Sequence, residues 1–348
     1  MSEDSNGAAR TLTGSWLCAH GGGLLDATIR TAPEEFQVDE ELGFDASGEG
    51  EHDLLKIEKS GVNTEWLARQ LAQHARVKSV DVGYAGRKDR HALTTQYFSV
   101  RRPGREGTDW SNFTAEGVRV LDILRHNRKL RRGAHSANYF RIAVRAADID
   151  TMQPEVLTRW QRITELGVPN YFGPQRFGRN NSNLGLARDI FKGKRVRRAQ
   201  RSICLSAARS WLFNEILSRR VAAGNWNRLV RGDLANLDGS GSVFKVDEVS
   251  DELEARCARF DIHPSASLWG EGAPLTGSSA ADIESVAVSP WPELTAGLID
   301  ARIAAGSRAM RLVPTAASLA FAENVAYLEF RLPRGGFATS VLAELVRF

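Results

Sequence analysis

One carboxylate stands among cations in the segment GRKDRHA, residues 86–92. Asp89 has Arg87, Lys88 and Arg90 as neighbours, and nearby positive charge favours the ionised form of a carboxylate. An ionised carboxylate is a competent nucleophile toward a sugar carbon. By itself this spacing is more often that of a surface turn with a local ion pair, so the chemistry needs support from other segments.

Two further segments combine aromatic rings with amides. Residues 168–178, VPNYFGPQRFG, add Arg176 to three aromatic side chains, and such a mixture suits splayed-out RNA bases and phosphates. Asn138 and Phe140 share one face of an expected strand, where an amide can hydrogen-bond a base edge and a ring can stack on it. Each segment also has a plain structural interpretation, as a packed loop and as a strand with its Phe in the core.

The motifs of several common enzyme classes are missing from the chain. It contains no GxxxxGK[ST] phosphate loop, no GxGxxG that opens a helix after a strand, and no HExxH. The seven histidines never have metal-ligand spacing, and the three cysteines, Cys18, Cys204 and Cys257, lie far apart with no CxxC. We therefore expect no metal, no nucleotide or nicotinamide cofactor and no disulfide framework.

The net charge of +4 conceals an uneven distribution of 46 basic and 42 acidic residues. Residues 1–60 and 247–300 are acid-rich, whereas 101–145 and 176–201 are basic. Two Arg-dominated blocks favour phosphate binding over an ordinary solvated surface. The cations that we expect to contact RNA are Arg125, Arg128, Lys129, Arg131, Arg132, Arg176, Lys192, Lys194, Arg195, Arg197 and Arg198.

The hydrophobic pattern predicts an α+β fold. Alternation predicts strands over 27–38, 53–58, 80–84, 95–101, 118–125, 138–144 and 325–332, with a helix from Asn63 or Thr64 to Arg76. Helices are expected over 155–166, 206–223, 293–305 and 340–348. Strands without regular βα alternation indicate a mixed or antiparallel sheet. Strand-rich ends around a helix-rich middle indicate one sheet domain with a second domain inserted into it.

The N-terminal residues and the hydropathy of the chain predict a soluble cytoplasmic protein. Residues 1–14 are polar and are expected to form a disordered tail, with no signal peptide. No stretch approaches about 18 consecutive apolar residues, so no membrane span is expected. Nothing in the sequence demands a protein partner or more than a monomer.

Several motifs in fixed order make the chain resemble a known family. They are Ala32-Pro33-Glu34-Glu35-Phe36, the 86–92 segment, Asn138-x-Phe140, the 168–178 segment, Leu205-Ser-Ala-Ala-Arg-Ser210 and Gly336-Phe337-Ala-Thr-Ser340. Together they resemble the TruD family of tRNA pseudouridine synthases, over essentially the whole chain after about residue 23.

The resemblance implies a fold, a domain division and an activity. It implies a pseudouridine-synthase catalytic domain, formed by residues 15–160 and 313–348 around a mixed, mainly antiparallel sheet and interrupted by an inserted α/β TRUD domain at 161–312. The implied reaction is the isomerisation of uridine to pseudouridine at position 13 of tRNA, without a cofactor. A tRNA-binding or tRNA-folding protein without catalysis is the alternative.

The resemblance also assigns residues to the site. Asp89 matches the catalytic aspartate, where it would attack the ribose anomeric carbon or assist loss of the base. Phe36, Asn138 and Phe337 match residues of the uridine pocket, with Phe140 beside them, and Lys88 matches the basic residue before the aspartate. The family usually has Lys where this chain has Arg30, and we expect Arg30 to form the ion pair to Asp89 in spite of its different geometry.

Overall fold

The computed structural model describes residues 16–102 and 108–348, and the expected tail at 1–14 lies outside them. The chain forms two compact units. The sheet unit comprises 23–164, 314–338 and 345–348, and the helical unit comprises 165–313 with residues up to 22 and 339–344. The short segments at 16–22 and 339–344 therefore group with the helical unit.

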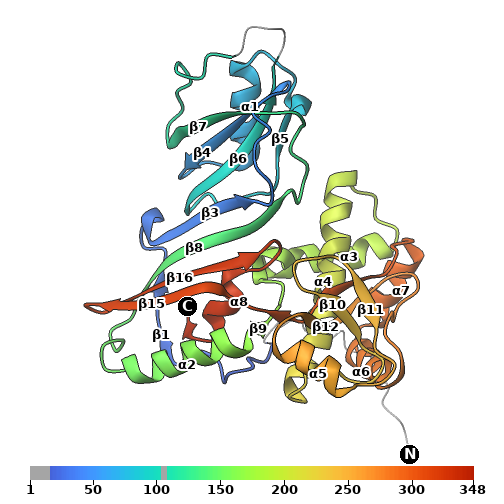
Figure 1. Ribbon diagram of the computed structural model, residues 1–348. Helices are drawn as coiled ribbons and strands as arrows, with labels where there is room; N and C mark the ends of the chain where they lie inside the picture. The colour runs from blue at the N-terminus through green and yellow to red at the C-terminus, as the bar shows by residue number, and fades with distance from the viewer. Residues whose placement is uncertain (1–15, 103–107) are drawn as a thin grey trace, which may run out of the picture. The chain divides into compact units, whose positions relative to one another are not determined.

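A large mixed sheet is the framework of the sheet unit (Figure 1). Its strand order is β15-β16-β8-β3-β6-β4-β7, and β2 and β5 pair with β8 and β6. All pairs are antiparallel except β3 with β6, which confirms the expected mixed, mainly antiparallel sheet. The strands are β2 (Thr28–Ile29), β3 (Phe36–Leu42), β4 (His52–Lys59), β5 (Val82–Tyr84), β6 (Leu93–Arg101), β7 (Val118–His126), β8 (His135–Arg145), β15 (Thr315–Ala322) and β16 (Val325–Pro333).

The register of this sheet puts the candidate site residues on one face. Glu40 of β3 pairs with Asn138 of β8, and Val38 pairs with Phe140 in the next row. Val38 also lies beside Thr94 of β6, which pairs with Lys59 of β4. Paired residues and their i±2 neighbours project to the same side of a sheet, so Lys59, Glu40, Asn138 and Phe140 share a face.

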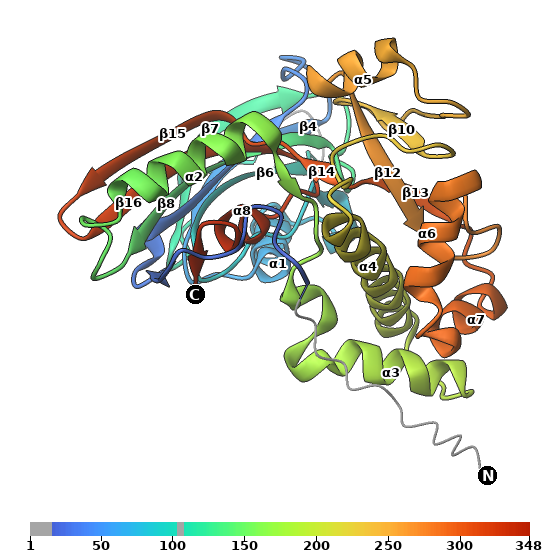
Figure 2. The same ribbon diagram turned by 90° about the horizontal axis from the view of Figure 1, so that it is seen from below.

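Two helices cover this face, α1 (Thr64–His74) and α2 (Gln153–Leu166) (Figures 1 and 2). Helix α1 begins as predicted, because the Asn63 side chain accepts a hydrogen bond from the Glu65 N–H and so caps its first turn. Helix α2 covers the same face at the β8–β16 end of the sheet, where the ring centroids of Trp160 and Phe330 lie 5.9 Å apart.

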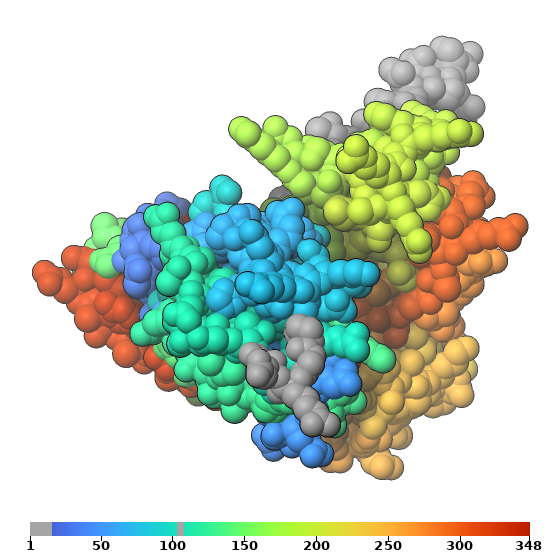
Figure 3. All heavy atoms as spheres, turned by 90° about the horizontal axis from the view of Figure 1, so that it is seen from above, coloured from blue at the N-terminus to red at the C-terminus, as the bar shows by residue number. Residues whose placement is uncertain are grey.

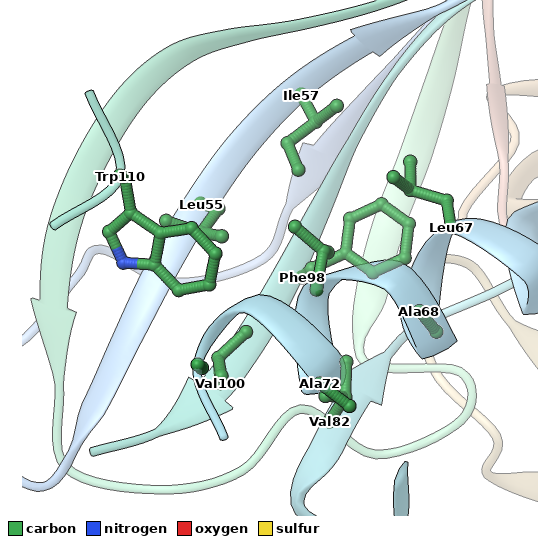
Figure 4. Close-up of a cluster of buried hydrophobic side chains, with 11 residues drawn as sticks. Leu55, Ile57, Leu67, Ala68, Ala72, Val82, Phe98, Val100 and Trp110 are labelled. Atoms are coloured by element: carbon green, nitrogen blue, oxygen red, sulfur yellow. The ribbon is translucent and has the colours of Figure 1, made fainter. Parts of the chain in front are cut away.

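A cluster of buried apolar side chains fixes α1 on the sheet (Figure 4). Leu67 and Ala72 of the helix belong to one cluster with Leu55, Phe98 and Val82 of three strands, and Trp110 lies beside Leu55 at one end. Leu55 and Phe98 are wholly buried. The helix position matters for the site, because the loop that follows β5 passes over the start of α1.

The helical unit is built around α4 (Arg198–Ala222) and a small antiparallel sheet of order β11-β10-β12-β13. Its elements are β9 (Val168–Pro169), α3 (Ser182–Phe191), α4, β10 (Leu234–Leu237), β11 (Val243–Lys245), α5 (Asp251–Ala258), β12 (Ile262–Leu268), α6 (Ser278–Val288), α7 (Pro292–Asp300), β13 (Gly306–Ala309), β14 (Arg311–Leu312) and α8 (Ala338–Ala343). The sheet unit also contains two short 3₁₀ turns, Pro33–Glu35 and Ser79–Asp81. The helical unit contains two more, Pro174–Phe177 and Arg179–Asn181.

Three helix boundaries differ markedly from the sequence expectation. The helix expected over 293–305 ends five residues early, because α7 stops at Asp300. Helix α4 begins eight residues before 206, because the basic first two turns are helical although they lack an apolar stripe. The expected helix over 340–348 ends at Ala343, and the chain then forms β17 (Val346–Arg347), which pairs in parallel with β1 (Leu25–Asp26). Pairing with β1, at the start of the sheet unit, overrides the helical pattern of residues 346–347.

The cluster under α1 yields a stability prediction. We expect Leu55→Ala to lower the free energy of unfolding by about 2 to 5 kcal/mol, because it leaves a cavity in a closed core. Ile123, paired with Leu55 in β7, has 49% of its surface exposed and is the matched control. Urea denaturation should show Ile123→Ala within about 0.5 kcal/mol of the wild type, and equal losses for both variants would contradict the packing described.

Candidate active site

The turn that carries Asp89 is held from beneath by side chains of α1 and β6. Gln96 donates from its amide to the Gly86 carbonyl at 3.2 Å. The Lys88 N–H donates to the Thr64 hydroxyl at 3.1 Å, and that hydroxyl in turn donates to Gln96 at 3.0 Å. These bonds tie the backbone just before Asp89 to β6 and α1, so the carboxylate has a defined position.

The Asp89 carboxylate is partly exposed and has two partners. Its Oδ2 lies 3.2 Å from Nη1 of Arg30, so the expected ion pair is present. Its Oδ1 accepts a hydrogen bond from the His91 N–H at 3.0 Å. The side chain keeps 25% of its surface exposed, which leaves the carboxylate accessible to a ligand.

Arg30 contacts both Asp89 and an aromatic ring. Its guanidinium carbon lies 4.1 Å from the centroid of the Phe36 ring, and Phe36 in turn meets Phe140 edge-to-face at 6.3 Å. A planar guanidinium can stack on a ring and bond a carboxylate at its edge at the same time, which an ammonium cannot do. Arg30 also has a φ of 63°, a left-handed conformation that is unfavourable for a residue with a Cβ. The difference from the family's usual Lys thus has a structural role here.

The two pocket phenylalanines of the sheet are more enclosed than expected. Phe36 and Phe140 are buried, and Phe140 stacks on Phe330 at 5.4 Å. Since Arg30 covers one face of the Phe36 ring, Phe36 supports the arginine. Phe337 is only half-buried in the turn before α8, and it stays a prediction as the ring that stacks on a base.

Lys88 turns away from Asp89 and binds two residues of the sheet face. Its Nζ lies 2.9 Å from Oε2 of Glu40 and donates a hydrogen bond to Oδ1 of Asn138. The Glu40 side chain is fully buried and that of Lys88 is 7% exposed, so the pair is shielded from water. Glu40 also accepts from the Tyr97 N–H at 3.1 Å.

Sequence reasoning missed Lys59 and Glu40. Lys59 is 1% exposed at the end of β4, and its Nζ donates to the carbonyls of Val62 at 3.0 Å and of Asp89 at 3.3 Å. Burial lowers the pKa of Lys59 to about 8, although the Asp89 charge opposes that shift. Both residues could have been suspected from charges at inward positions of alternating strands: Lys59 follows Leu55 and Ile57, and Glu40 follows Phe36 and Val38.

The first basic block is only partly free to bind a ligand. Arg125 lies 3.4 Å from buried Asp53, and Lys129 donates to a backbone carbonyl. Arg131 and Arg132 are both exposed, and Arg132 lies over the Tyr84 ring at 3.8 Å. The fifth member, Arg128, is exposed and lies 5.8 Å from the centroid of the Phe44 ring.

The second basic block divides in the same way. Arg176 is half-buried, 5.3 Å from the Phe172 ring centroid and 3.3 Å from the Ser206 hydroxyl, and burial lowers its pKa. Lys194 forms an exposed ion pair with Asp189 at 2.9 Å. Lys192, Arg195, Arg197 and Arg198 are exposed as well, around the first turn of α4, which contains no acidic residue. Figure 3 shows this yellow-green segment at the surface.

A hollow of about 380 Å³ lies on the other side of the sheet. It is lined by Asp39, Glu41, Glu58, Lys56 and Arg141, among others, and Arg141 pairs with Asp39 at 2.7 Å. Three of its carboxylates form ion pairs with arginines, and its lining does not include Asp89. We therefore place the site at the turn of residues 86–91.

The described part of the chain offers no metal site and no membrane span. No three His, Cys, Asp or Glu side chains within residues 16–102 and 108–348 converge as metal ligands. None of the helices in these ranges is both long and apolar enough to cross a membrane.

A mixed sheet that bears one arginine-paired aspartate in a turn, beside an amide and aromatic rings, is the arrangement of a pseudouridine synthase. The family model described as tRNA pseudouridine synthase D (TruD) matches residues 15–204 and 193–345. The chain belongs to this family.

Individual relatives agree with the family match. The tRNA pseudouridine synthase D of Methylococcus capsulatus is 45% identical over 333 residues, which cover 95% of this chain and 94% of the relative. That of Xanthomonas campestris pv. campestris is 44% identical over 343 residues, covering 94% and 93%. A crystal structure of the putative TruD of Methanosarcina mazei superimposes with a TM-score of 0.71 at 21% identity, covers 95% of this chain and 96% of that one, and supports the fold.

The lowered pKa of Lys59 predicts that the stability of the protein depends on pH. Because its pKa falls to about 8 in the folded chain from 10.5, the unfolded chain binds more protons between these values. The wild type should therefore gain stability relative to Lys59→Met as the pH rises from 8 to 10.5. The measurement is urea unfolding of both proteins at pH 7.5 and pH 10.

Leu55→Ala is the control for this comparison, because removal of an apolar side chain should cost the same at both pH values. If the difference between wild type and Lys59→Met were also independent of pH, the depressed pKa of Lys59 would be wrong.

Proposed function

We propose that the protein isomerises uridine to pseudouridine in tRNA, at position 13, with Asp89 as the nucleophile and no cofactor. The observation that carries this proposal is the accessible Asp89 carboxylate in its anchored turn, paired with Arg30, in a chain of the TruD family. The names of the relatives identify tRNA as their substrate. Arg125, Arg128, Lys129, Arg131, Arg132, Arg176, Lys192, Lys194, Arg195, Arg197 and Arg198 remain the proposed RNA contacts, with the exposed members binding phosphates directly.

The chemistry begins when the target uridine leaves its stack. Flipping costs a few kcal/mol, and phosphate contacts to exposed cations such as Arg131, Arg195 and Arg198 offset it. The base then lies between Phe337 and the amide of Asn138. The negative charge of Asp89 stands against C1′ of the ribose, where it serves either direct attack or loss of the base.

The surroundings of Asp89 suit this reaction. Arg30 holds the carboxylate without burying it, and the neighbouring Phe36 and Phe140 rings make that side of the pocket apolar. An apolar wall excludes water, which would otherwise hydrolyse the sugar intermediate and leave an abasic site.

The protein acts as a monomer in the cytoplasm under this proposal. Asp89, Arg30, Lys88, Asn138 and Phe140 all belong to the sheet unit of one chain, so no second copy is needed to complete the site. The cytoplasm is where tRNA is processed and where the thiols of Cys18, Cys204 and Cys257 would stay reduced.

Substitution of the aspartate tests the catalytic claim. Asp89→Asn keeps the shape but removes the charge, so turnover should fall at least about a thousandfold while tRNA binding persists. Carbodiimide mapping of position 13 reports the product, and mass spectrometry should find the mass of the tRNA unchanged. Exposed Asp282 of α6 provides the control variant Asp282→Asn.

Each alternative gives a different result in that experiment. Full activity in Asp89→Asn would refute the role of Asp89, and loss of a base from the tRNA would indicate a base-excising enzyme. Absence of pseudouridine with the wild type, together with tight binding, would indicate a tRNA-binding protein without catalysis.

The cations at the start of α4 yield a separate prediction on affinity. Replacing Arg195, Arg197 and Arg198 by Ala should weaken tRNA binding and reduce the slope of log K against log salt concentration by about 2. Filter binding from 50 to 200 mM salt measures both. The matched control neutralises exposed acids of α5 (Asp251→Asn with Glu252→Gln), and an equal change in slope there would contradict a local phosphate contact.

A further inference from the structure

The buried ammonium of Lys59 joins three segments of the sheet unit. Lys59 ends β4 and is 1% exposed, so its charge is enclosed by protein. Its Nζ donates to the carbonyl of Val62, just before α1, at 3.0 Å and to the carbonyl of Asp89 at 3.3 Å. The lysine thus links the end of a strand, the approach to a helix and the turn that carries the nucleophile.

The main chain of this turn is anchored both before and after the Asp89 side chain. Before it, the backbone bonds to uncharged side chains of β6 and α1. After it, the Asp89 carbonyl accepts from Lys59, and the Arg90 carbonyl accepts from the Gly61 N–H at 2.8 Å. Among these four anchoring bonds, the one from Lys59 has a donor whose charge changes with pH.

The charge of Lys59 strengthens the bonds that it makes. Hydrogen bonds from an ionised donor are about twice as strong as those between neutral groups. A neutral amine would keep two N–H donors but lose that strength. Since a buried ammonium is costly, an apolar residue would be expected here, after Leu55 and Ile57 at the preceding inward positions of the strand. The carbonyls that it holds account for a charge at this place.

The charges that act on Lys59 come from the turn itself. Burial lowers the pKa of Lys59 to about 8, the negative charge of Asp89 opposes this shift, and the positive charge of Lys88 adds to it. The lysine is therefore charged at neutral pH and becomes neutral under mildly alkaline conditions.

The elements packed around Lys59 present uncharged partners to it. In the sheet it pairs with Thr94 of β6 and Val118 of β7. On α1 the acidic residue of the first turn, Glu65, is exposed and forms an ion pair with Arg87. The protonation state of Lys59 thus depends on the turn that it supports.

We propose that Lys59 is a positioning residue, whose positive charge holds the main chain of Asp89 where its carboxylate reaches the ribose; this rests on the proposed function. Lys59 is enclosed, so it touches neither the base nor a phosphate. Displacement of a reacting group by about 1 Å can cost about a hundredfold in rate. A weaker bond at this carbonyl should therefore reduce the rate of the reaction more than the affinity for tRNA.

Three side chains at position 59 test the proposal, because they differ in when they carry charge. The wild type loses its charge as the pH rises through about 8, Lys59→Met is never charged, and Lys59→Arg stays charged throughout. The measurement is the single-turnover rate of pseudouridine formation in unmodified tRNA at saturating enzyme, from pH 6.5 to 9.5. Circular dichroism checks over this range that each protein is folded.

The ratios of the rates carry the expected result. At pH 6.5 the wild type should react about tenfold faster than Lys59→Met, with affinities for tRNA that agree within about twofold. By pH 9.5 this ratio should fall to about threefold or less, with a midpoint near pH 8, because the neutral amine bonds more weakly. The ratio of Lys59→Arg to Lys59→Met should stay constant with pH. Titration of the tRNA and of other protein groups affects all three proteins and cancels.

Stability and rate should respond in opposite directions to the loss of this charge. Between the pKa of Lys59 of about 8 in the folded chain and 10.5 in the unfolded chain, the wild type gains stability relative to Lys59→Met. Its advantage in rate falls over the same interval. A lysine that acted on the rate through stability alone would move both quantities in the same direction.

Lys56→Met is the matched control. Lys56 lies on the same strand, but it lines the hollow on the other side of the sheet. Its rate should stay within about twofold of the wild type at every pH. A fall with pH in the ratio of wild type to Lys56→Met, equal to that for Lys59→Met, would contradict a role specific to Lys59.

The outcomes separate this inference from the proposed function. Pseudouridine formation with a constant ratio of wild type to Lys59→Met would overturn the role of the charge while the function stands. If Lys59→Met does not fold, the ratio of Lys59→Arg to wild type replaces it and should rise above pH 8, and a constant ratio would again overturn the inference. Absence of pseudouridine with the wild type at every pH would overturn the function itself, and the inference with it.

Discussion

Charged groups placed on an apolar sheet face are the constraint around which the site is built. Lys59 and Glu40 are buried on a sheet face that is otherwise uncharged, and the side chain of Lys88 reaches this face from the turn after β5. Buried charges are costly unless they are paired or bonded. Glu40 neutralises Lys88, and the carbonyls of Val62 and Asp89 accept hydrogen bonds from Lys59. Movement of the turn would take one of these two acceptors from a buried ammonium, and this helps to fix the position of the exposed carboxylate.

The strand arrangement brings these charges together. The parallel pair of the large sheet, β3 with β6, sets Glu40 between Asn138 of β8 and the β4 strand that ends in Lys59. Helix α1 then supplies the Thr64 hydroxyl that receives the Lys88 N–H. Four separate segments of the chain thus contribute to the surroundings of Asp89.

The sequence predicted the mixed sheet and helix α1 better than the contacts that each site residue makes. Period-two alternation and the Asn63 cap indicated the sheet and α1, because both patterns are local. The partners of Lys88 could not be predicted, since they depend on strand register over long distances in sequence. The same holds for the packing of Arg176 against the Phe172 ring, which its motif does not reveal. The Arg30 pair was predicted from the resemblance, whereas its stacking on Phe36 required the geometry.

The pairing of β16 with β8 has a consequence for how the protein is made. Val325–Pro333 lies beside the strand that carries Asn138 and Phe140, and Phe330 stacks directly on Phe140. On the ribosome this neighbour emerges almost two hundred residues after β8 itself. The face of the sheet that holds Asp89 is therefore incomplete throughout synthesis, and an unfinished chain would expose apolar rings where the finished one has a wall. Assembly of the site is in this way tied to completion of the polypeptide.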